Sequence, residues 1–412
     1  MFPKKAIFVL MAVLAASLAG CATYQDQVRE SRKLISNGNT EQSLAQFQKL
    51  ASKEDGDQLV HLLDYGAALQ IANKFPESNE VLLRSDKLAD QLDYQSISRL
   101  AGSMLTSEDV VQYKGDTFEK IFINAYLAMN YLQLGKLDDA LVESRRMNEK
   151  YLKLRNEEKK KFELNPFAKY LSALIWEADG AWDDAYIAFK ETYELSPNIA
   201  TIKEDLIRSA KRSRRIDDYK QWKEAFPEVK ENPDWYDKGK GELIVIYQQG
   251  WGPRKTYDKS SPRFPTLQPT YNQTEKAELQ IVGNGSYFSR PVYNVESAAI
   301  QTLMDDRAAL VGRRIGGIVA KEVMADQIRQ KNELLGLIAW IFFHASDRAD
   351  LRQWSLLPQT IQVIRVPLKP GKYDYSIKGF DLGGRPTNEN LDGQSVEIKA
   401  GRKVFRVWRS LT

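Results

Sequence analysis

The chain has a single cysteine, Cys21, and only two histidines, His61 and His344, in 412 residues. One cysteine excludes an internal disulfide, so a chain of this size must rely on its hydrophobic core for stability. A zinc site would have to be built almost wholly from carboxylates, which suit zinc poorly. We therefore expect neither a metal nor another cofactor.

The sequence also has no large excess of either basic or acidic side chains. The sequence holds 59 basic and 55 acidic side chains, which gives a net charge of +4. Without Lys4 and Lys5, which precede an apolar run at the amino terminus, 57 basic side chains remain and the net charge falls to +2. A nearly neutral chain lacks the electrostatic footprint of a nucleic-acid-binding protein, and we exclude that class of partner.

No apolar run reaches the ~20 residues that a membrane-spanning helix needs. The run at residues 6–16 follows the positive pair Lys4 and Lys5 and ends before a group of small residues. This order of a positive region, a short apolar region and small residues is typical of a secretory signal peptide, here residues 1–20.

The four residues Leu18, Ala19, Gly20 and Cys21 resemble the lipobox of bacterial lipoproteins. The resemblance implies cleavage before Cys21, a thioether-linked lipid on its sulfur and acylation, for example by palmitate, of the new amino terminus. Ala22 follows where lipoproteins of the enterobacterial kind that stay in the inner membrane carry Asp, so the resemblance also implies the periplasmic side of the outer membrane. The alternative is an ordinary cleaved signal followed by a chance cysteine.

Five similar stretches recur in the first half of the chain: GNTEQS at Gly38, NKFPES at Asn73, GKLDDA at Gly135, GAWDDA at Gly180 and RRIDDY at Arg214. Each reads as a turn followed by the start of a helix. The first two are 35 residues apart and the last two 34 residues apart. This is the period of the tetratricopeptide repeat (TPR), in which two antiparallel helices form one unit.

We predict a TPR-like solenoid over residues 21–230; the alternative is a helical bundle with coincidental spacing. Small residues are expected where the two helices of a unit touch, a glycine where the first helix ends, a proline after the second, and aromatic residues in the gap to the next unit. The residues expected in these roles are Ala128, Tyr131, Gly135, Ala140, Ala173, Trp176, Gly180, Ala185, Phe189 and Pro197.

A basic cluster follows the best repeat copy and comprises Arg208, Lys211, Arg212, Arg214 and Arg215. Two interpretations remain open. The cluster forms either a contact with anionic lipid head groups or acidic cell-wall polymer, or a solvated helix face, which is the usual meaning of such a run.

The pattern changes at residues 231–241, which read as a linker. Residues 242–412 predict an antiparallel β domain, a small sheet or sandwich, so the fold class is α+β. A β-run lies at residues 243–247, and the prolines of residues 253–269 argue against regular structure there. Hairpins are expected around Asn284-Gly285, Pro370-Gly371 and Ala400-Gly401.

A helical insert is expected at about residues 296–350, because apolar residues recur there at helical spacing. Gly316 and Gly317 are a candidate kink. Residues 334–343 are apolar on every face but too few to span a membrane. They either insert into a membrane surface or subunit interface or form a helix buried between sheet and solenoid, and we favour burial.

The polar cluster at residues 344–358 contains Asp347 and Asp350 among arginines. Glycan cleavage needs two carboxylates at a fixed separation, one of them with a raised pKa. No such tuning is visible, and Arg–Asp pairs that hold a helix end are the more common meaning. We find no nucleophile elbow, phosphate-binding loop or metal-spaced histidine pair.

The lipobox, the repeats and the stretches GELIVIYQQG and DLRQWSLLP together resemble a poorly characterised family of bacterial TPR-like outer-membrane lipoproteins. Its members are often encoded beside LpoB-like lipoproteins, which implies envelope or cell-wall work but transfers no catalytic residue.

The resulting hypothesis is a non-catalytic scaffold that binds a periplasmic or outer-membrane protein through a TPR-like groove. One alternative is an enzyme acting on peptidoglycan or another envelope glycan with Asp347, Asp350 or Glu322. Another is a structural subunit of a secretion or surface machine, with residues 334–343 at the subunit contact.

Overall fold

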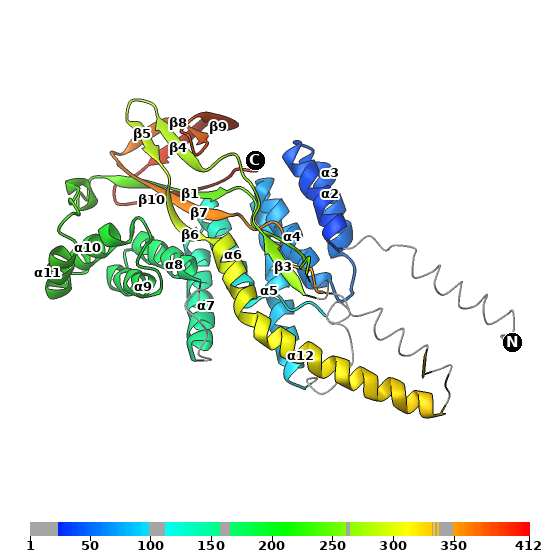
Figure 1. Ribbon diagram of the computed structural model, residues 1–412. Helices are drawn as coiled ribbons and strands as arrows, with labels where there is room; N and C mark the ends of the chain where they lie inside the picture. The colour runs from blue at the N-terminus through cyan, green and yellow to red at the C-terminus, as the bar shows by residue number, and fades with distance from the viewer. Residues whose placement is uncertain are drawn as a thin grey trace.

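The computed structural model describes residues 24–98, 112–156, 165–260, 264–331, 333, 336–337 and 349–412. Helices make up the first half of the chain, and strands with one long helix make up the second (Figure 1). The first half is a row of antiparallel helical hairpins and the second contains antiparallel sheets, so the predicted mixture of helical repeats and a β domain is seen at this coarse level.

Ten helices of the described residues pair into five hairpins, and successive hairpins pack side by side. The hairpins are α2 (Tyr24–Ser36) with α3 (Thr40–Ala51), α4 (Gln58–Ile71) with α5 (Phe75–Ser98), α6 (Thr117–Gln133) with α7 (Leu137–Asn156), α8 (Pro166–Asp179) with α9 (Trp182–Leu195), and α10 (Ile202–Arg212) with α11 (Ile216–Ala225). We call the surface formed by α2, α4, α6, α8 and α10 the inner face and that formed by α3, α5, α7, α9 and α11 the outer face.

Every hairpin turn uses one backbone device. Gly38, Asn73, Gly135, Gly180 and Arg214 all have positive φ angles, between 59° and 84°. In each turn the N–H of the following residue donates to the carbonyl oxygen five positions earlier, at 2.8–3.0 Å. This is the Schellman ending of a helix, which requires a left-handed residue and favours glycine. Asn73 and Arg214 adopt the same left-handed conformation although neither is a glycine.

Small residues lie where the two helices of a hairpin touch. The buried pairs Ala128–Ala140 and Ala173–Ala185 each join positions 12 residues apart. In α4 and α5 the equivalent pair is Gly66 and Ser78, whose hydroxyl donates to the Gly66 carbonyl oxygen at 2.7 Å. A Cβ on Gly66 would lie 2.6 Å from Leu82 Cδ2. Close helix approach therefore excludes larger side chains at these positions.

The second half forms two four-stranded sheets and a separate two-stranded ribbon. One sheet has the order β10-β1-β7-β6, the other β5-β4-β8-β9, and β2 pairs with β3. The strands are β1 (Gly241–Gln249), β2 (Arg254–Tyr257), β3 (Pro265–Gln268), β4 (Lys276–Ile281), β5 (Gly285–Phe288), β6 (Arg290–Asn294), β7 (Thr360–Leu368), β8 (Gly371–Phe380), β9 (Pro386–Ile398) and β10 (Lys403–Arg409).

Several strand-level predictions are wrong. The expected hairpin around Asn284-Gly285 forms, as β4 and β5. The other two do not: β7 and β8 lie in different sheets, and so do β9 and β10, so the chain crosses between sheets at both turns. The domain is also not wholly antiparallel, because β1 and β10 pair in parallel. The proline-rich stretch 253–269 contains regular structure after all, the ribbon of β2 and β3, since Pro265 lies at a strand end.

The molecule has three layers: the solenoid, the first sheet and the second sheet (Figure 1). The side chains of strand β1 contact both neighbouring layers. Leu243, Val245 and Tyr247 pack against the second sheet, whereas Ile244 and Ile246 belong to one core with the solenoid. Both faces of β1 are buried, which fits the continuous apolar run at residues 243–247.

The helical insert is α12 (Val295–Lys331), which runs without interruption through Gly316 and Gly317. Its first turns pack on β3 and β7, and the rest projects from the body (Figure 1). Met304 and Val323 on this helix are 68% and 52% exposed. Residues 334–343, for which burial between sheet and solenoid was favoured, lie largely outside the described residues.

Candidate functional site

The inner face of the solenoid is filled by the chain itself. Residues 349–359, which connect back to β7, lie against α2, α4 and α6. Trp354 is 2% exposed, and its ring centroid lies 5.0 Å from that of Tyr126 on α6. Leu356 and Leu357 belong to the same core. The protein's own segment and first sheet therefore occupy the inner face, so the predicted partner-binding groove is not open there.

Two buried carboxylates hold this segment by its backbone. Glu119 Oε1 accepts the N–H of Trp354 at 2.7 Å, and Asp64 Oδ1 accepts the N–H of Leu356 at 3.1 Å. A buried tyrosine completes each site: the hydroxyl of Tyr113 donates to Glu119, and that of Tyr24 to Asp64 at 2.6 Å. These contacts replace the backbone partners that the irregular segment lacks.

Burial raises the pKa of both carboxyls. For Asp64 the pKa rises to about 7, although the bonds from Tyr24 and Leu356 and the nearby Arg32 oppose the shift. For Glu119 it also rises to about 7, by burial and by repulsion from Asp116. The neighbouring His61 has a lowered pKa, again because burial disfavours its charged form.

The start of the segment is fixed by ion pairs. Arg352 contacts Asp350 at 2.7 Å and Asp57 at 2.8 Å, and its guanidinium lies over the ring of Tyr113. Gln25, in the first turn of α2, donates to the Leu351 carbonyl oxygen at 2.6 Å. The favoured interpretation, Arg–Asp pairs that hold a helix end, is seen in part: Arg352 pairs with Asp57 at the start of α4, but residues 349–359 are not themselves helical.

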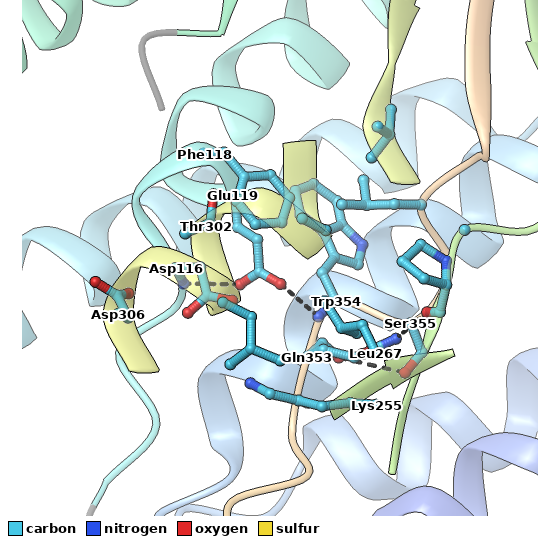
Figure 2. Close-up of a pocket in the computed structure, with 16 residues that line it drawn as sticks. Asp116, Phe118, Glu119, Lys255, Leu267, Thr302, Asp306, Gln353, Trp354 and Ser355 are labelled. Atoms are coloured by element: carbon cyan, nitrogen blue, oxygen red, sulfur yellow. Dashed lines mark hydrogen bonds between the residues drawn. The ribbon is translucent and has the colours of Figure 1, made fainter. Parts of the chain in front are cut away.

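A cavity of about 40 Å³ borders this segment and is lined by Asp116, Glu119, Lys255 and Trp354 among others. Figure 2 shows Glu119 between the backbone N–H groups of Asp116 and Trp354, both of which it accepts. A pKa near 7 is suitable for a general acid. However, the oxygens of Glu119 already accept three hydrogen bonds, from the hydroxyl of Tyr113 and the N–H groups of Asp116 and Trp354. The space suits ordered water rather than a sugar ring, so the geometry gives no support to glycan cleavage here.

The three carboxylates proposed for an enzyme are not brought together by the described residues. Asp350 is held by Arg352, and Glu322 lies exposed on the projecting part of α12. Asp347 lies outside the described residues. Within the described ranges no group of three or more His, Cys, Asp or Glu side chains could hold a metal ion.

A second polar cluster ties the solenoid to the first sheet. Arg365 on β7 contacts Glu177 at 2.7 Å, Asp205 at 3.1 Å and Glu242 at 2.8 Å, and its side chain is 9% exposed. Although burial opposes ionisation, Arg208, Arg365 and Lys403 lower the pKa of Glu177 to about 2. The cluster stays charged because each buried charge has several partners.

The predicted repeat residues lie in the hairpin cores or their turns. Tyr131 and Trp176 are partly buried against the core, Phe189 is fully buried, and Pro197 follows the end of α9. Trp176 also lies under the guanidinium of Arg145, 5.6 Å from its ring centroid. Most of these positions therefore serve hairpin packing, and Gly180 also lines a cavity of about 320 Å³ beside Arg208 and Lys403.

The basic cluster is mostly paired within the protein. Arg208 is buried against Glu177 and Asp205, so its assignment to an anionic contact is wrong. Lys211 contacts Glu231, and Arg215 contacts Asp183. The remaining two members differ: Arg212 donates to the Trp235 carbonyl oxygen, whereas Arg214 is an exposed turn residue.

The residues that hold the inner segment were missed by the sequence analysis. Asp64 stands inside the apolar helix stretch LVHLLDYGAAL, where a carboxylate must be paired or hydrogen-bonded, and this was the available signal. Glu119 lies in the first turn of α6 and forms a capping box with Asp116, so nothing in the sequence indicated its contact with Trp354. Cys21, the signal peptide and His344 lie outside the described residues. Among the described helices, none has the length and apolarity required to cross a membrane.

No family model and no curated protein matches the chain. Similar solved structures include MamA AMB-1, at 16% identity over 49% of this chain and 91% of that one, with a TM-score of 0.31. MamA from Desulfovibrio magneticus RS-1 gives 17% identity over 49% of this chain and 90% of that one, with a TM-score of 0.32. A likeness at this level supports no inference about function.

Proposed function

We propose that the protein is a non-catalytic scaffold, held by lipid on Cys21 at the periplasmic side of the outer membrane, that binds a protein partner in envelope or cell-wall assembly. The observation that carries this proposal is the use of the two solenoid faces. The inner face packs against the protein's own β domain, whereas apolar side chains on the helices of the outer face remain exposed to solvent. Leu83, Val142, Ile187 and Ile216 are 38%, 43%, 43% and 53% exposed, one on each of α5, α7, α9 and α11.

A rigid body close to the bilayer suits such a scaffold. Tyr24 opens α2 and is buried among Asp64, Gln353 and Ser355. Its Cα lies at most about 11 Å along the chain from Cys21, since three residue steps cannot reach further. Lipid at Cys21 would therefore hold the solenoid close to the membrane surface, because no long linker separates the lipid from α2.

The proposal is tested by photo-crosslinking in intact cells. A photoreactive amino acid replaces Val142 or Ile187 on the outer face, and Val282, 73% exposed in the turn between β4 and β5, serves as the control. We expect one envelope protein to be crosslinked from both outer-face positions and not from Val282. The same partner captured equally from all three positions, or from none, contradicts an outer-face scaffold.

The anchor is tested separately. Cys21→Ser is expected to abolish incorporation of labelled palmitate and to release the protein from membranes. An unacylated mature wild-type protein would overturn the lipid part of the proposal and leave the scaffold part standing.

One observation favours a second candidate, a structural subunit. Helix α12 projects from the body and keeps Met304 and Val323 exposed, which fits a contact between subunits. Size measurement of the detergent-purified full chain decides between the two: a stable large ring replaces the scaffold, and a monomer removes the subunit candidate.

A further inference from the structure

Trp251, just after β1, is held in one orientation by its neighbours. Its backbone N–H donates to Asn272 Oδ1 at 2.8 Å, and its indole N–H donates to the Leu411 carbonyl oxygen at 2.6 Å. Gly250 makes room for this arrangement, because a Cβ at that position would collide with the Asn272 side chain. The indole is therefore a fixed platform between the end of β1 and the end of the chain.

Two arginines from distant parts of the sequence lie over this ring. The guanidinium carbon of Arg32 on α2 is 4.6 Å from the ring centroid, and that of Arg409 at the end of β10 is 5.1 Å from it. Burial lowers the pKa of Arg32 to about 10; Arg409 and Arg254 add to this shift, and Asp64 opposes it. Three like charges, those of Arg32, Arg409 and Arg254 at the start of β2, therefore gather around one indole.

The guanidinium groups lack acceptors. Within the part of the chain that the structure describes, neither Arg32 nor Arg254 makes a hydrogen bond or an ion pair. Arg409 donates from Nη1 to Gln248 Oε1 at 3.2 Å, but its Nε and Nη2 atoms are buried without a partner. A buried donor without an acceptor is costly, most of all on a charged group, so these N–H groups indicate an acceptor that the described residues do not supply.

The two carboxylates that act on these arginines are already occupied. Asp64 accepts from the hydroxyl of Tyr24 and the N–H of Leu356, and Glu389 accepts from the backbone N–H groups of residues 411–412. Neither carboxylate forms an ion pair with any of the three arginines, all five of which are described residues. Water can accept the free hydrogen bonds, but only an anion also offsets the gathered positive charge.

We infer that Arg32, Arg254 and Arg409 form a binding site for a phosphate group. Arginine forks match phosphate oxygens with paired N–H groups. A carboxylate offers only two oxygens and a single charge, fewer than three guanidinium groups can use. Arg254 is exposed and Arg32 is partly exposed, so the site is open to solvent at the start of β2.

Free phosphate and a phospholipid head group share this chemistry. The site itself goes beyond the proposed scaffold, and only the phospholipid source rests on it. Arg32 follows Tyr24 by eight residues of α2, or about 12 Å of helix, which places it near the proposed lipid anchor. The two sources are therefore separate arms of the test.

The test is isothermal titration calorimetry on the full chain purified in detergent, in chloride buffer of constant ionic strength. One arm titrates inorganic phosphate, and the other titrates glycerophosphoglycerol, the chain-free head group of phosphatidylglycerol. We expect Arg32→Gln and Arg254→Gln each to weaken binding by about tenfold. Arg29→Gln is the matched control, because Arg29 is exposed on the same helix and pairs with Asp26; it should leave binding unchanged.

Folding is checked by thermal unfolding of each variant. Since Arg32→Gln removes repulsion between like charges, this variant should be at least as stable as wild type in chloride and less stable in phosphate, where the ligand stabilises only wild type. A lower midpoint in both buffers means that Arg32 serves packing alone and overturns its role in binding.

The two arms identify the source. Tighter binding of inorganic phosphate supports a site for the free anion, and tighter binding of glycerophosphoglycerol supports one for a lipid head group. No binding of either probe, or equal binding by wild type, Arg32→Gln and Arg254→Gln, overturns the inference. An unacylated mature protein that still binds inorganic phosphate removes the anchor and leaves this site standing.

Discussion

The backbone N–H of Trp354 donates to Glu119 Oε1 at 2.7 Å, across 235 positions of sequence. This bond joins the segment that precedes β7 to the first turn of α6. Together with the bond from Leu356 to Asp64, it makes the inner face of the solenoid part of one core with the first sheet. The two halves of the chain should therefore unfold as one unit.

Trp354→Ala tests the shared core. Removing this buried indole is expected to lower the free energy of unfolding by about 3–5 kcal/mol. Denaturant unfolding monitored by circular dichroism should still show one transition for helices and strands. Leu382→Ala, at a side chain that is 88% exposed, is the control and should change stability by less than about 0.5 kcal/mol. Two separate transitions in the wild type would contradict the shared core.

Asp64→Asn tests the buried carboxylates. The pKa of Asp64 is raised to about 7 from 3.8, so between about pH 4 and pH 7 the folded state holds a proton that the unfolded state has lost. The contribution of Asp64 to the free energy of unfolding therefore falls as the pH rises through this window, by about 4 kcal/mol at most. The uncharged amide of the variant can still accept from the Leu356 N–H and donate to the Tyr24 oxygen.

The expected outcome is a smaller loss of stability between pH 4 and pH 7 in the Asp64→Asn variant than in wild type, measured by urea unfolding at several pH values. Glu119 titrates in the same window and keeps part of the slope in both proteins. Equal slopes in variant and wild type would show that Asp64 is ionised throughout.

Arg365→Ala tests the ionic cluster between solenoid and sheet. The change leaves the buried carboxylates of Glu177 and Asp205 without one of their partners, and we expect a loss of about 3–5 kcal/mol. Arg385, whose side chain is 84% exposed beside Asp381, is the matched control. Arg385→Ala should cost no more than about 1 kcal/mol in the same chemical-denaturation experiment. Equal small losses would place the cluster outside the core.

Arg214→Gly tests the shared turn device. Arg214 holds φ at 61° and is exposed, so glycine removes the strain of a left-handed side chain. We expect a gain of up to about 1 kcal/mol, reduced by the greater chain entropy of glycine when unfolded. The reverse change, Gly180→Arg, should lose a similar amount. A rise in the thermal midpoint for the second and a fall for the first would refute the turn geometry.

The helical hairpins could be predicted because their signals are local. Gly38, Gly135 and Gly180 mark left-handed turns by residue type alone, and the small partners Ala140 and Ala185 follow at fixed spacing. At Asn73 and Arg214 only the spacing of the repeat carried the prediction.

The pairing of strands could not be predicted in the same way. Pro370-Gly371 and Ala400-Gly401 do form turns, as their sequences predict. The same turn residues can join two strands of one hairpin or two strands of different sheets, so they do not decide the pairing. The position of residues 349–359 depends on contacts with Tyr24, Asp64 and Glu119, hundreds of positions away. The local sequence pattern does not show such contacts, and only the carboxylate of Asp64 within an apolar helix indicated one of them.

The most direct test of this account is hydrogen exchange at the amides of Trp354 and Leu356, measured by mass spectrometry on the detergent-purified full chain. A segment that belongs permanently to the core should exchange them as slowly as the buried amides of α6, through global unfolding alone. Rapid exchange at both amides while α6 stays protected would mean that the segment leaves the inner face, and would contradict the claim that the protein fills its own groove.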